Sequence, residues 1–310
     1  MQDATLSDVT YDCLVIGGGP AGLTAAIYLA RFHLSVLVVD SGDSRAELIP
    51  LTRNHAGFPE GISGSALLSR MREQAGLYGT QLRSARVDTL SLGPDGFEAL
   101  SGSAAFRART VLLATGVVNR RPPMIGAADH ARALAEGRLR YCPICDGYEV
   151  TDKRIAVLGT GERGTNEALF LRGYTQDIGL VAPEGGHELS DEQRADLHDA
   201  GVQIVGVCDA AVLEEDGLRL DIEGASIRVD SLYPALGSDI RSELAREVGA
   251  EMSDEGCLIV DAHQRTNVPG LYAAGDVVLG LDQISHAMGE GGVAATTIRN
   301  DLARKAPLRR

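Results

Sequence analysis

Near the N-terminus, the pattern of apolar and polar positions is that of a strand, a turn and a helix in succession. An apolar run at 12–16 (D-C-L-V-I) is followed by a glycine-rich turn at 17–22, by helical spacing at 23–32 and by a second apolar run at 35–39. Short apolar runs predict buried strands, and apolar residues at every third or fourth position predict a helix. We therefore predict a βαβ unit that begins close to residue 12.

The same order of positions recurs in the middle of the chain. A strand is predicted at 155–158, a glycine turn at 159–164, a helix at 166–172 and a further strand at 177–181. Other predicted elements are a helix at 65–75, strands and turns within 81–110, a buried strand at 110–114 and a helix at 283–300. Repeated βαβ units predict an α/β fold with two Rossmann-like, three-layer nucleotide-binding domains.

Two stretches containing proline, 119–123 and 234–239, are candidate linkers between these domains. If both are linkers, the second domain is inserted into the first. We then expect one domain to comprise 1–117 and 240–310, and the inserted domain to comprise 118–239.

The first glycine turn carries the spacing of a dinucleotide site. Gly17, Gly19 and Gly22 follow the G-x-G-x-x-G pattern, and Asp40 ends the next predicted strand. Such glycines allow a tight turn and a close approach of the backbone to a pyrophosphate, which the start of the helix then holds. A carboxylate at the position of Asp40 can accept hydrogen bonds from ribose hydroxyls.

A second signal is the sequence C-P-I-C at Cys142–Cys145. A zinc site needs about four ligands, and the other cysteines stand singly in the chain: Cys13, Cys208 and Cys257. Zinc and a pair of unreactive buried cysteines remain alternatives, but the spacing favours a dithiol–disulfide couple. Asp146 follows at once and is a candidate for moving a proton. We predict no metal site.

A third signal is the stretch T-N-V-P-G-L-Y-A-A-G-D at 266–276. It predicts a turn, a short strand and a sharp corner before the helix at 283–300. Asp276, at the end of that strand, is placed to bind a hydroxyl of a nucleotide cofactor. A plain strand-to-helix corner is nearly as good an interpretation of the stretch taken alone.

Composition narrows the classes of partner. The chain of 310 residues has a net charge of −14, which argues against nucleic acid and anionic membranes as partners, because phosphate binding needs clustered Lys and Arg. Residues 1–10 lack the apolar core of a signal peptide, and no apolar run reaches the roughly 20 residues of a membrane span. We therefore expect a cytoplasmic protein, in which close cysteines are catalytic or bind metal.

With these signals in place, the chain resembles the low-molecular-weight thioredoxin reductase family of flavoproteins over essentially its whole length. The resemblance rests on five motifs in order: G-G-G-P-A-G-L-T-A-A-I-Y-L-A-R from Gly17, A-T-G from Ala114, C-x-x-C-D-G from Cys142, the second glycine turn from Gly159, and A-A-G-D from Ala273.

The resemblance implies FAD in the first domain and a nicotinamide nucleotide in the inserted one. It also implies a homodimer, and electron flow through FAD to the Cys pair and on to a thioredoxin-like protein or a small disulfide. Carried over by position, Cys145 is the sulfur near the flavin and Cys142 attacks the substrate, with Asp146 as the third catalytic residue. The implied FAD contacts are Gly17, Gly19, Pro20, Ala21, Gly22, Asp40, Asn54, Thr115, Gly116, Gly275, Asp276, Gln283 and Ile284.

The chain departs from the family where members that use NADPH carry a basic cluster for the 2′-phosphate. The equivalent stretch, 180–184, reads L-V-A-P-E and has no cation. Glu184 would repel a 2′-phosphate but suits the 2′-hydroxyl of NADH. The bulky pair Glu162-Arg163 in the second glycine turn is also compatible with a site that no longer binds a nucleotide.

Stretches at 41–46, 54–59 and 280–284 are similar to those of divergent branches, which include ferredoxin-linked reductases and dithiol oxidases. In those oxidases a His commonly follows the second Cys, whereas this chain has Asp146, as the reductases do. His55 and His286 are candidate bases near the flavin, although packing or surface roles are the simpler interpretation. The alternatives to a reductase are therefore a dithiol oxidase that uses oxygen and a flavin-binding redox sensor without turnover.

Overall fold

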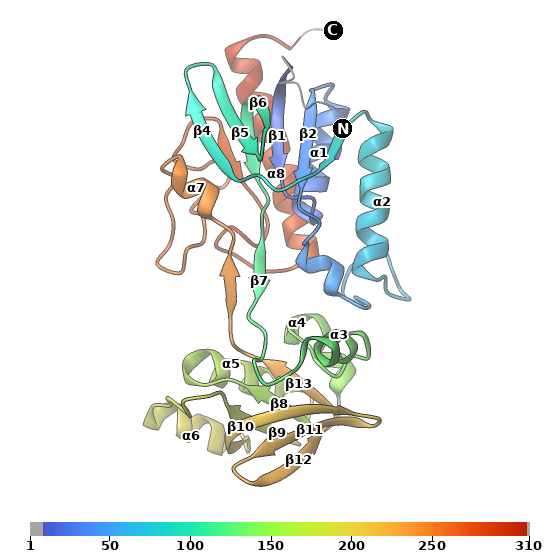
Figure 1. Ribbon diagram of the computed structural model, residues 1–310, viewed down its shortest axis with the longest axis vertical. Helices are drawn as coiled ribbons and strands as arrows, with labels where there is room; N and C mark the ends of the chain where they lie inside the picture. The colour runs from blue at the N-terminus through green and yellow to red at the C-terminus, as the bar shows by residue number, and fades with distance from the viewer. Residues whose placement is uncertain (1–8, 309–310) are drawn as a thin grey trace. The chain divides into compact units, whose positions relative to one another are not determined.

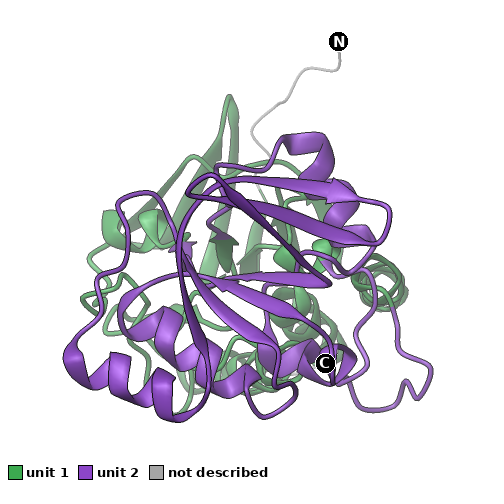
Figure 2. Ribbon diagram, turned by 90° about the horizontal axis from the view of Figure 1, so that it is seen from below, with its two compact units in different colours: residues 1–48, 63–118, 240–310 green, residues 49–62, 119–239 purple. Residues whose placement is uncertain are grey.

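The computed structural model describes residues 9–308. Contacts within the chain divide it into two compact units (Figure 2). Unit 1 comprises residues 1–48, 63–118 and 240–310, and unit 2 comprises residues 49–62 and 119–239. The chain therefore leaves unit 1 twice, once for the short segment 49–62 and once for the long insertion.

Unit 1 is built on a seven-stranded sheet. Its strands are β1 (Thr10–Ile16), β2 (Val36–Asp40), β3 (Gln81–Ser84), β4 (Thr89–Gly93), β5 (Gly96–Ser101), β6 (Ala104–Leu113) and β15 (Leu271–Ala273). They lie in the order β3-β2-β1-β6-β5-β4, and β15 also pairs with β6. The pairs β3-β2, β2-β1, β1-β6 and β6-β15 are parallel, whereas β4, β5 and β6 form an antiparallel meander.

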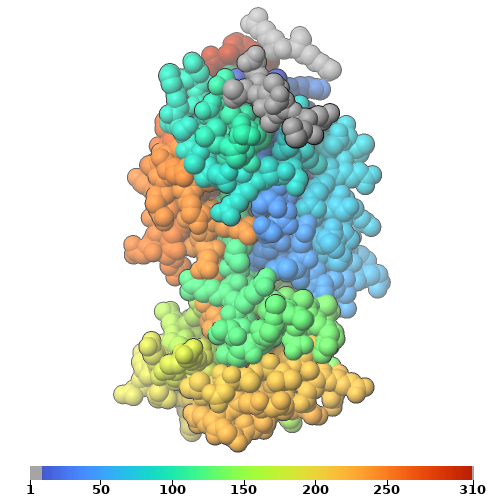
Figure 3. Space-filling model, viewed as in Figure 1, coloured from blue at the N-terminus to red at the C-terminus, as the bar shows by residue number. Residues whose placement is uncertain are grey.

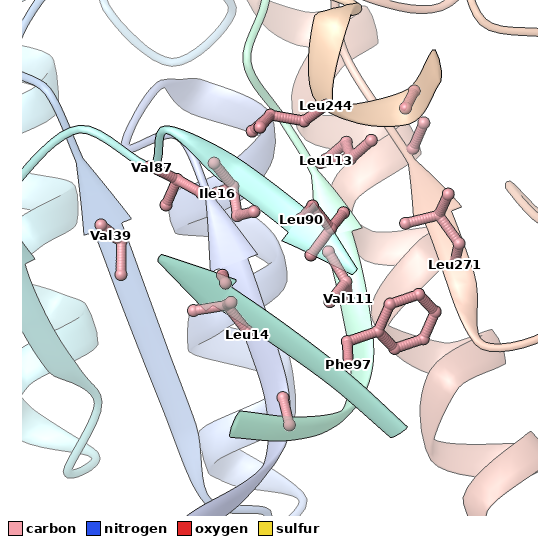
Figure 4. Packing of buried hydrophobic residues seen from close by; sticks show 14 of the residues in the cluster. Leu14, Ile16, Val39, Val87, Leu90, Phe97, Val111, Leu113, Leu244 and Leu271 are labelled. Atoms are coloured by element: carbon pink, nitrogen blue, oxygen red, sulfur yellow. The ribbon is translucent and has the colours of Figure 1, made fainter. Parts of the chain in front are cut away.

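The side chains of β1 alternate between the two faces of this sheet, as the period of two in a strand requires. Cys13 and Val15 pack with apolar residues of α1 (Pro20–Arg31) and α8 (Ile284–Lys305). Leu14 and Ile16 point to the other face, where they pack with Phe97 and other residues of the meander (Figure 4). Unit 1 thus has a buried core on each side of its sheet.

The helices of unit 1 are α1, η1 (Arg45–Leu48), α2 (Gly64–Leu77), α7 (Glu243–Glu247) and α8 (Figure 1). Helices α1 and α8 approach each other closely, because a side chain on Gly291 of α8 would collide with the backbone oxygen of Ala21 in α1. This close packing holds the start of α1 next to the corner that follows β15.

Unit 2 has a six-stranded sheet in the order β12-β11-β10-β9-β8-β13. Its strands are β8 (Ile155–Leu158), β9 (Ile178–Ala182), β10 (Gln203–Glu214), β11 (Gly217–Ile222), β12 (Ala225–Val229) and β13 (Ser231–Pro234). The strands from β13 to β10 run parallel, and β11 and β12 add an antiparallel hairpin. Most residues of β12 are exposed, and this segment lies on the face of unit 2 that Figure 3 shows.

The helices of unit 2 are α3 (Ala127–Ala135), α4 (Pro143–Asp146), η2 (Gly147–Val150), α5 (Gly161–Leu171) and α6 (Asp191–Asp199). One face of the sheet packs with α5 and α6 through Ile155 and Val157, and the other packs with α3 and the long strands through Ala156 and Leu158. Both units are therefore three-layer α/β structures, as predicted from the two βαβ patterns.

The stretches predicted as linkers, 119–123 and 234–239, overlap two short strands that pair with each other, β7 (Val117–Asn119) and β14 (Ser238–Ile240). Pro234 itself is the last residue of β13 rather than part of a linker. Within residues 9–308, no helix is both long enough and apolar enough to cross a membrane.

Candidate functional site

The first glycine turn joins β1 to α1, and two of its glycines cannot be replaced without moving the backbone. Gly17 has a φ of +110°, and a side chain there would collide with the carbonyl oxygen of Ala114. A Cβ on Gly22 would collide with the carbonyl oxygen of Gly17. The turn is therefore as tight as the sequence motif predicted.

Asp40, at the end of β2, is tied to this turn. Its Oδ1 accepts a hydrogen bond of 3.0 Å from the backbone N–H of Gly18, and its Oδ2 lies 3.6 Å from the Arg72 guanidinium. A Cβ on Gly19 would meet just the Ser44 hydroxyl, at 3.3 Å, among the described residues. Open backbone at Gly19, the start of α1 and a carboxylate beside them suit the pyrophosphate and ribose of a dinucleotide.

The corner after β15 brings further candidates to unit 1. Gly275 has a φ of +81°, and its N–H donates to Glu290 Oε2 at 2.7 Å. Glu290 Oε1 lies 3.1 Å from His286 Nε2, one turn earlier in α8. Glu290 therefore ties the corner to α8 and orients His286, a candidate base that the sequence singled out without this partner.

Asp276 follows Gly275, and its carboxylate is 3.0 Å from Arg45 Nη1. The same guanidinium atom lies 2.9 Å from Asp282. Arg45 was not predicted as a site residue, because no motif links a residue of η1 to one 231 positions later. The remaining candidates of unit 1 lie in the described elements: Pro20 and Ala21 begin α1, and Gln283 and Ile284 begin α8.

Thr115 and Gly116 lie just after β6. The Thr115 hydroxyl donates to the Arg241 carbonyl at 2.6 Å, and the Arg241 N–H donates to the Gly116 carbonyl at 3.0 Å. Asn54 lies in the segment 49–62, which belongs to unit 2, where its Oδ1 accepts from the Thr52 hydroxyl at 2.9 Å. His55 stacks on Phe58 in the same segment. The assignment of Asn54 to the flavin stays a prediction.

The cysteine pair lies at the start of α4 in unit 2. Cys142 and Cys145 form a disulfide, and both are partly buried. Cys142 is the N-cap of α4, Pro143 is its first residue, and the Cys145 N–H donates to Cys142 Sγ at 3.2 Å. Because a proline at the first helical position sets the backbone for a helix, the local sequence itself closes this small ring.

Both oxygens of the Asp146 carboxylate are held by other side chains. Arg140 Nη1 lies 2.8 Å from Oδ2, and the Tyr233 hydroxyl donates to Oδ1 at 2.9 Å. Burial raises the pKa of Asp146, whereas Arg140 and the hydrogen bond from Tyr233 lower it. The sequence missed both partners. A tyrosine in the buried run S-L-Y-P was the one available signal, since a buried phenol needs a hydrogen-bond partner.

The other three cysteines are free thiols in different environments. Burial raises the pKa of Cys13 to about 12 and that of Cys208 to about 11, so both stay protonated near neutral pH. Cys257 is partly buried, and burial raises its pKa as well. The Cys142–Cys145 pair is therefore the thiol pair placed for redox chemistry.

The second glycine turn joins β8 to α5 and differs from the first in its surroundings. A Cβ on Gly164 would lie 2.8 Å from the carbonyl carbon of Gly159, so this turn is tight as well. The Thr160 hydroxyl, however, accepts a hydrogen bond of 2.6 Å from the N–H of Glu188, in the loop after β9. Glu184 is exposed in that loop.

Comparison with known proteins places the chain in a family. Residues 11–291 match the family model described as pyridine nucleotide-disulphide oxidoreductase. The thioredoxin reductase of Mycolicibacterium smegmatis is 32% identical over 290 residues, which cover 88% of this chain and 90% of that protein.

Solved structures show the same fold. The structure of HlmI is 29% identical with a TM-score of 0.88, covering 98% of this chain and 96% of that one. The thioredoxin reductase of Streptococcus pyogenes is 25% identical with a TM-score of 0.88, covering 96% and 100%. The chain therefore belongs to the pyridine nucleotide-disulphide oxidoreductase family and is, within it, a thioredoxin reductase-like enzyme.

Proposed function

We propose that this enzyme passes electrons between FAD bound to unit 1 and the Cys142–Cys145 couple of unit 2, and on to an outer disulfide. The observation that carries the proposal is the disulfide at the start of α4, followed directly by an acid whose carboxylate two side chains hold in place. A disulfide in this setting is built to be broken and reformed rather than to staple the fold.

The residues of unit 1 fit FAD. The glycine turn and the start of α1 would hold the pyrophosphate, and Asp40 would accept from the ribose. Asp276, next to the close contact of α1 with α8, would accept from the ribityl chain, and Arg45 beside it would hold that carboxylate in place. A bound flavin would supply and accept the electron pair.

The two cysteines are not equivalent. Cys142 Sγ receives the N–H of Cys145, and a donor at this position stabilises a thiolate. Cys142 is therefore suited to be the thiolate that attacks the outer substrate, in agreement with the family resemblance. Asp146 would give a proton to a sulfur when the disulfide is broken and take one when it reforms.

The second glycine turn indicates which electron donor to expect. It has the G-x-G-x-x-G spacing of a nucleotide site, but Glu184 lies in the loop where a 2′-phosphate would need a cation. We expect NADH to be a better donor than NADPH, and reduced ferredoxin is the alternative if neither reduces the flavin. We further expect a homodimer, and a thioredoxin-like protein or a small disulfide as the outer substrate.

Anaerobic stopped-flow spectroscopy of the FAD-loaded protein tests this function. The flavin should be reduced by one of the three donors, and an added disulfide should then reoxidise it. Cys145→Ser should abolish the second step while leaving the first, and Cys257→Ser is the matched control that should change neither. If the disulfide reoxidises Cys145→Ser as fast as the unchanged enzyme, the couple is not on the electron path. Peroxide formation from dithiols, without disulfide reduction, would instead indicate a dithiol oxidase.

A further inference from the structure

The carboxylate of Asp146 is held from two directions within unit 2. Arg140, just before the cysteine pair, reaches Oδ2 at 2.8 Å, and Tyr233 of β13 reaches Oδ1 at 2.9 Å. These partners are 6 and 87 positions away in sequence, so the arrangement depends on the fold. A carboxylate with both oxygens occupied has a fixed orientation and a fixed set of neighbours.

The two partners are themselves immobilised. Arg140 Nε donates to the Gly137 carbonyl at 2.8 Å, and the Arg140 N–H donates to the Leu232 carbonyl at 3.0 Å. The Arg140 side chain is only 15% exposed, and Tyr233 is fully buried. Both side chains are therefore already fixed before the chemistry takes place, as preorganised support of a reacting group requires.

Other charged groups act on Asp146 as well. Glu149 of η2 raises its pKa through its negative charge, and Glu149 is itself 3.4 Å from Arg53 of the same unit. On α5, burial raises the pKa of Glu167 to about 7, which Arg163 counteracts and the charge of Asp146 reinforces. Among the described residues, Arg140 is thus the one cation in contact with Asp146. It lowers the pKa of Asp146, which burial and the negative charge of Glu149 raise.

We propose that Arg140 and Tyr233 are positioning residues for Asp146, which hold both of its oxygens and thereby set the pH range in which it exchanges a proton with the reduced cysteine pair. The inference rests on the proposed function, because it assigns a role to residues that support the same cysteine couple. Arg140 contributes the larger effect because it carries a full charge, whereas Tyr233 contributes a neutral hydrogen bond.

Reduction of the disulfide calls for a proton, which Asp146 is placed to give. A bound flavin would supply the electron pair that breaks the Cys142–Cys145 bond and leaves both sulfurs as thiolates. The Asp146 carboxyl gives its proton to one of them, so that one thiol and one thiolate remain. The carboxylate so formed is stabilised where it stands by Arg140 and by the Tyr233 O–H, and it regains a proton from water. Without Arg140 the carboxylate is less stable, and Asp146 stays protonated to higher pH.

The test follows the pH dependence of cysteine alkylation in the FAD-loaded protein, after reduction with a phosphine under anaerobic conditions. Iodoacetamide modifies the thiolate, and mass spectrometry reports the rate for Cys142 at each pH. The ionisation of Asp146 should appear as an inflection that Asp146→Asn removes. This readout needs no turnover, and a merely structural role would lower the yield of folded protein without moving the inflection.

The expected shifts have opposite signs for different neighbours. Arg140→Met should move the inflection to higher pH by about one unit or more, because an opposite charge at this range moves a pKa by about 1–3 units. Tyr233→Phe should move it in the same direction by less. Glu149→Gln removes a negative charge and should move it to lower pH. Arg138→Met, two positions from Arg140 and bonded instead to the Asp230 carbonyl, should leave it in place.

Failure of the inference can be told from failure of the proposed function. If the flavin of the unchanged protein exchanges electrons with the couple, but the inflection is absent or stays in place in Arg140→Met, the positioning role is wrong. If the couple exchanges no electrons with the flavin, the proposed function is wrong. Should Arg140→Met not fold, Tyr233→Phe and Glu149→Gln still decide the matter, because shifts of equal sign would overturn the inference.

Discussion

The chain contains two glycine turns with the same G-x-G-x-x-G spacing, and their surroundings differ. In the turn of unit 1, Asp40 accepts the N–H of Gly18, and the backbone at Gly19 stays open. In the turn of unit 2, the Thr160 hydroxyl instead accepts a hydrogen bond from the N–H of Glu188, in the loop after β9. Glycine spacing therefore builds the turn, whereas the neighbouring residues decide which ligand it can hold.

The two turns also differ in the charged residues beside them. Asp40 lies beside a tight turn with Arg72 at 3.6 Å, in the arrangement that suits a ribose and its phosphates. Glu184, after β9, is exposed in a stretch without a cation. We therefore expect the first turn to bind FAD tightly. The second turn should bind a nicotinamide nucleotide weakly, and more weakly if the nucleotide carries a 2′-phosphate.

The largest expected effect comes from filling the first turn. Gly22→Val places a branched side chain against the carbonyl oxygen of Gly17, and overpacking against backbone costs about 1–3 kcal/mol or more. We expect the purified protein to lose its flavin and to melt at a lower temperature, as measured by absorbance and calorimetry. Gly164→Val in the second turn is the matched control: its Cβ would lie 2.8 Å from the carbonyl carbon of Gly159, so this variant should also melt at a lower temperature but keep its flavin. Equal flavin loss in both variants would refute the difference between the turns.

A smaller effect is expected from the acid of the first turn. Asp40→Ala removes the carboxylate that would accept from the ribose of FAD, and hydrogen bonds to charged groups contribute about 1.5–3 kcal/mol. The affinity for FAD should therefore fall about 10- to 100-fold, measured by titrating the apoprotein with FAD. Asp43→Ala, in the exposed loop that follows, should bind FAD normally. An unchanged affinity of Asp40→Ala would exclude a role for this carboxylate.

The second turn is tested by reversing a charge. Glu184→Arg should raise the ratio of NADPH to NADH efficiency in flavin reduction about tenfold, because a cation can then pair with the 2′-phosphate. Glu215→Arg makes the same charge change at an exposed position in the turn between β10 and β11 and should leave the ratio as it is. If neither nucleotide reduces the flavin in any of these proteins, the second turn is not a working donor site.

The smallest effect concerns the loop that is bonded to the second turn. Thr160→Val removes the acceptor for the Glu188 N–H and should lower the free energy of unfolding by about 1 kcal/mol. Thr160→Ser keeps the hydroxyl and should restore most of that stability in a denaturant titration. Flavin content should be unchanged in both variants, and a loss of flavin would contradict the independence of the two turns.

Much of the fold could be predicted because its βαβ units are local in sequence. Helix α1 was predicted at 23–32 and lies at Pro20–Arg31. Apolar spacing marks the start of a helix at its first apolar residue, whereas this helix begins at a proline, which is favoured at the first helical position. Helix α5 likewise begins at Gly161 rather than at residue 166. Both helices start within their glycine turns, where helix propensity is lowest.

The contacts that complete the sites could not be predicted. Tyr233 meets Asp146 across 87 positions, and Arg45 meets Asp276 across 231, so no local pattern reports either pair. The hairpin of β11 and β12 and helix α6 were also missed, although Ser190 and Gln193 form a capping box that marks the start of α6. Sequence motifs identified the reacting groups but not the residues that support them.

Electron exchange between the flavin and the Cys142–Cys145 couple is tested most directly by a reductive titration. The FAD-loaded protein is titrated anaerobically with dithionite while flavin absorbance and free thiols are followed. We predict that the unchanged enzyme takes up two electron pairs per chain, one by the flavin and one by the disulfide, and that Cys145→Ser takes up one. Uptake of a single pair by both proteins, with the disulfide intact beside fully reduced flavin, would contradict the account.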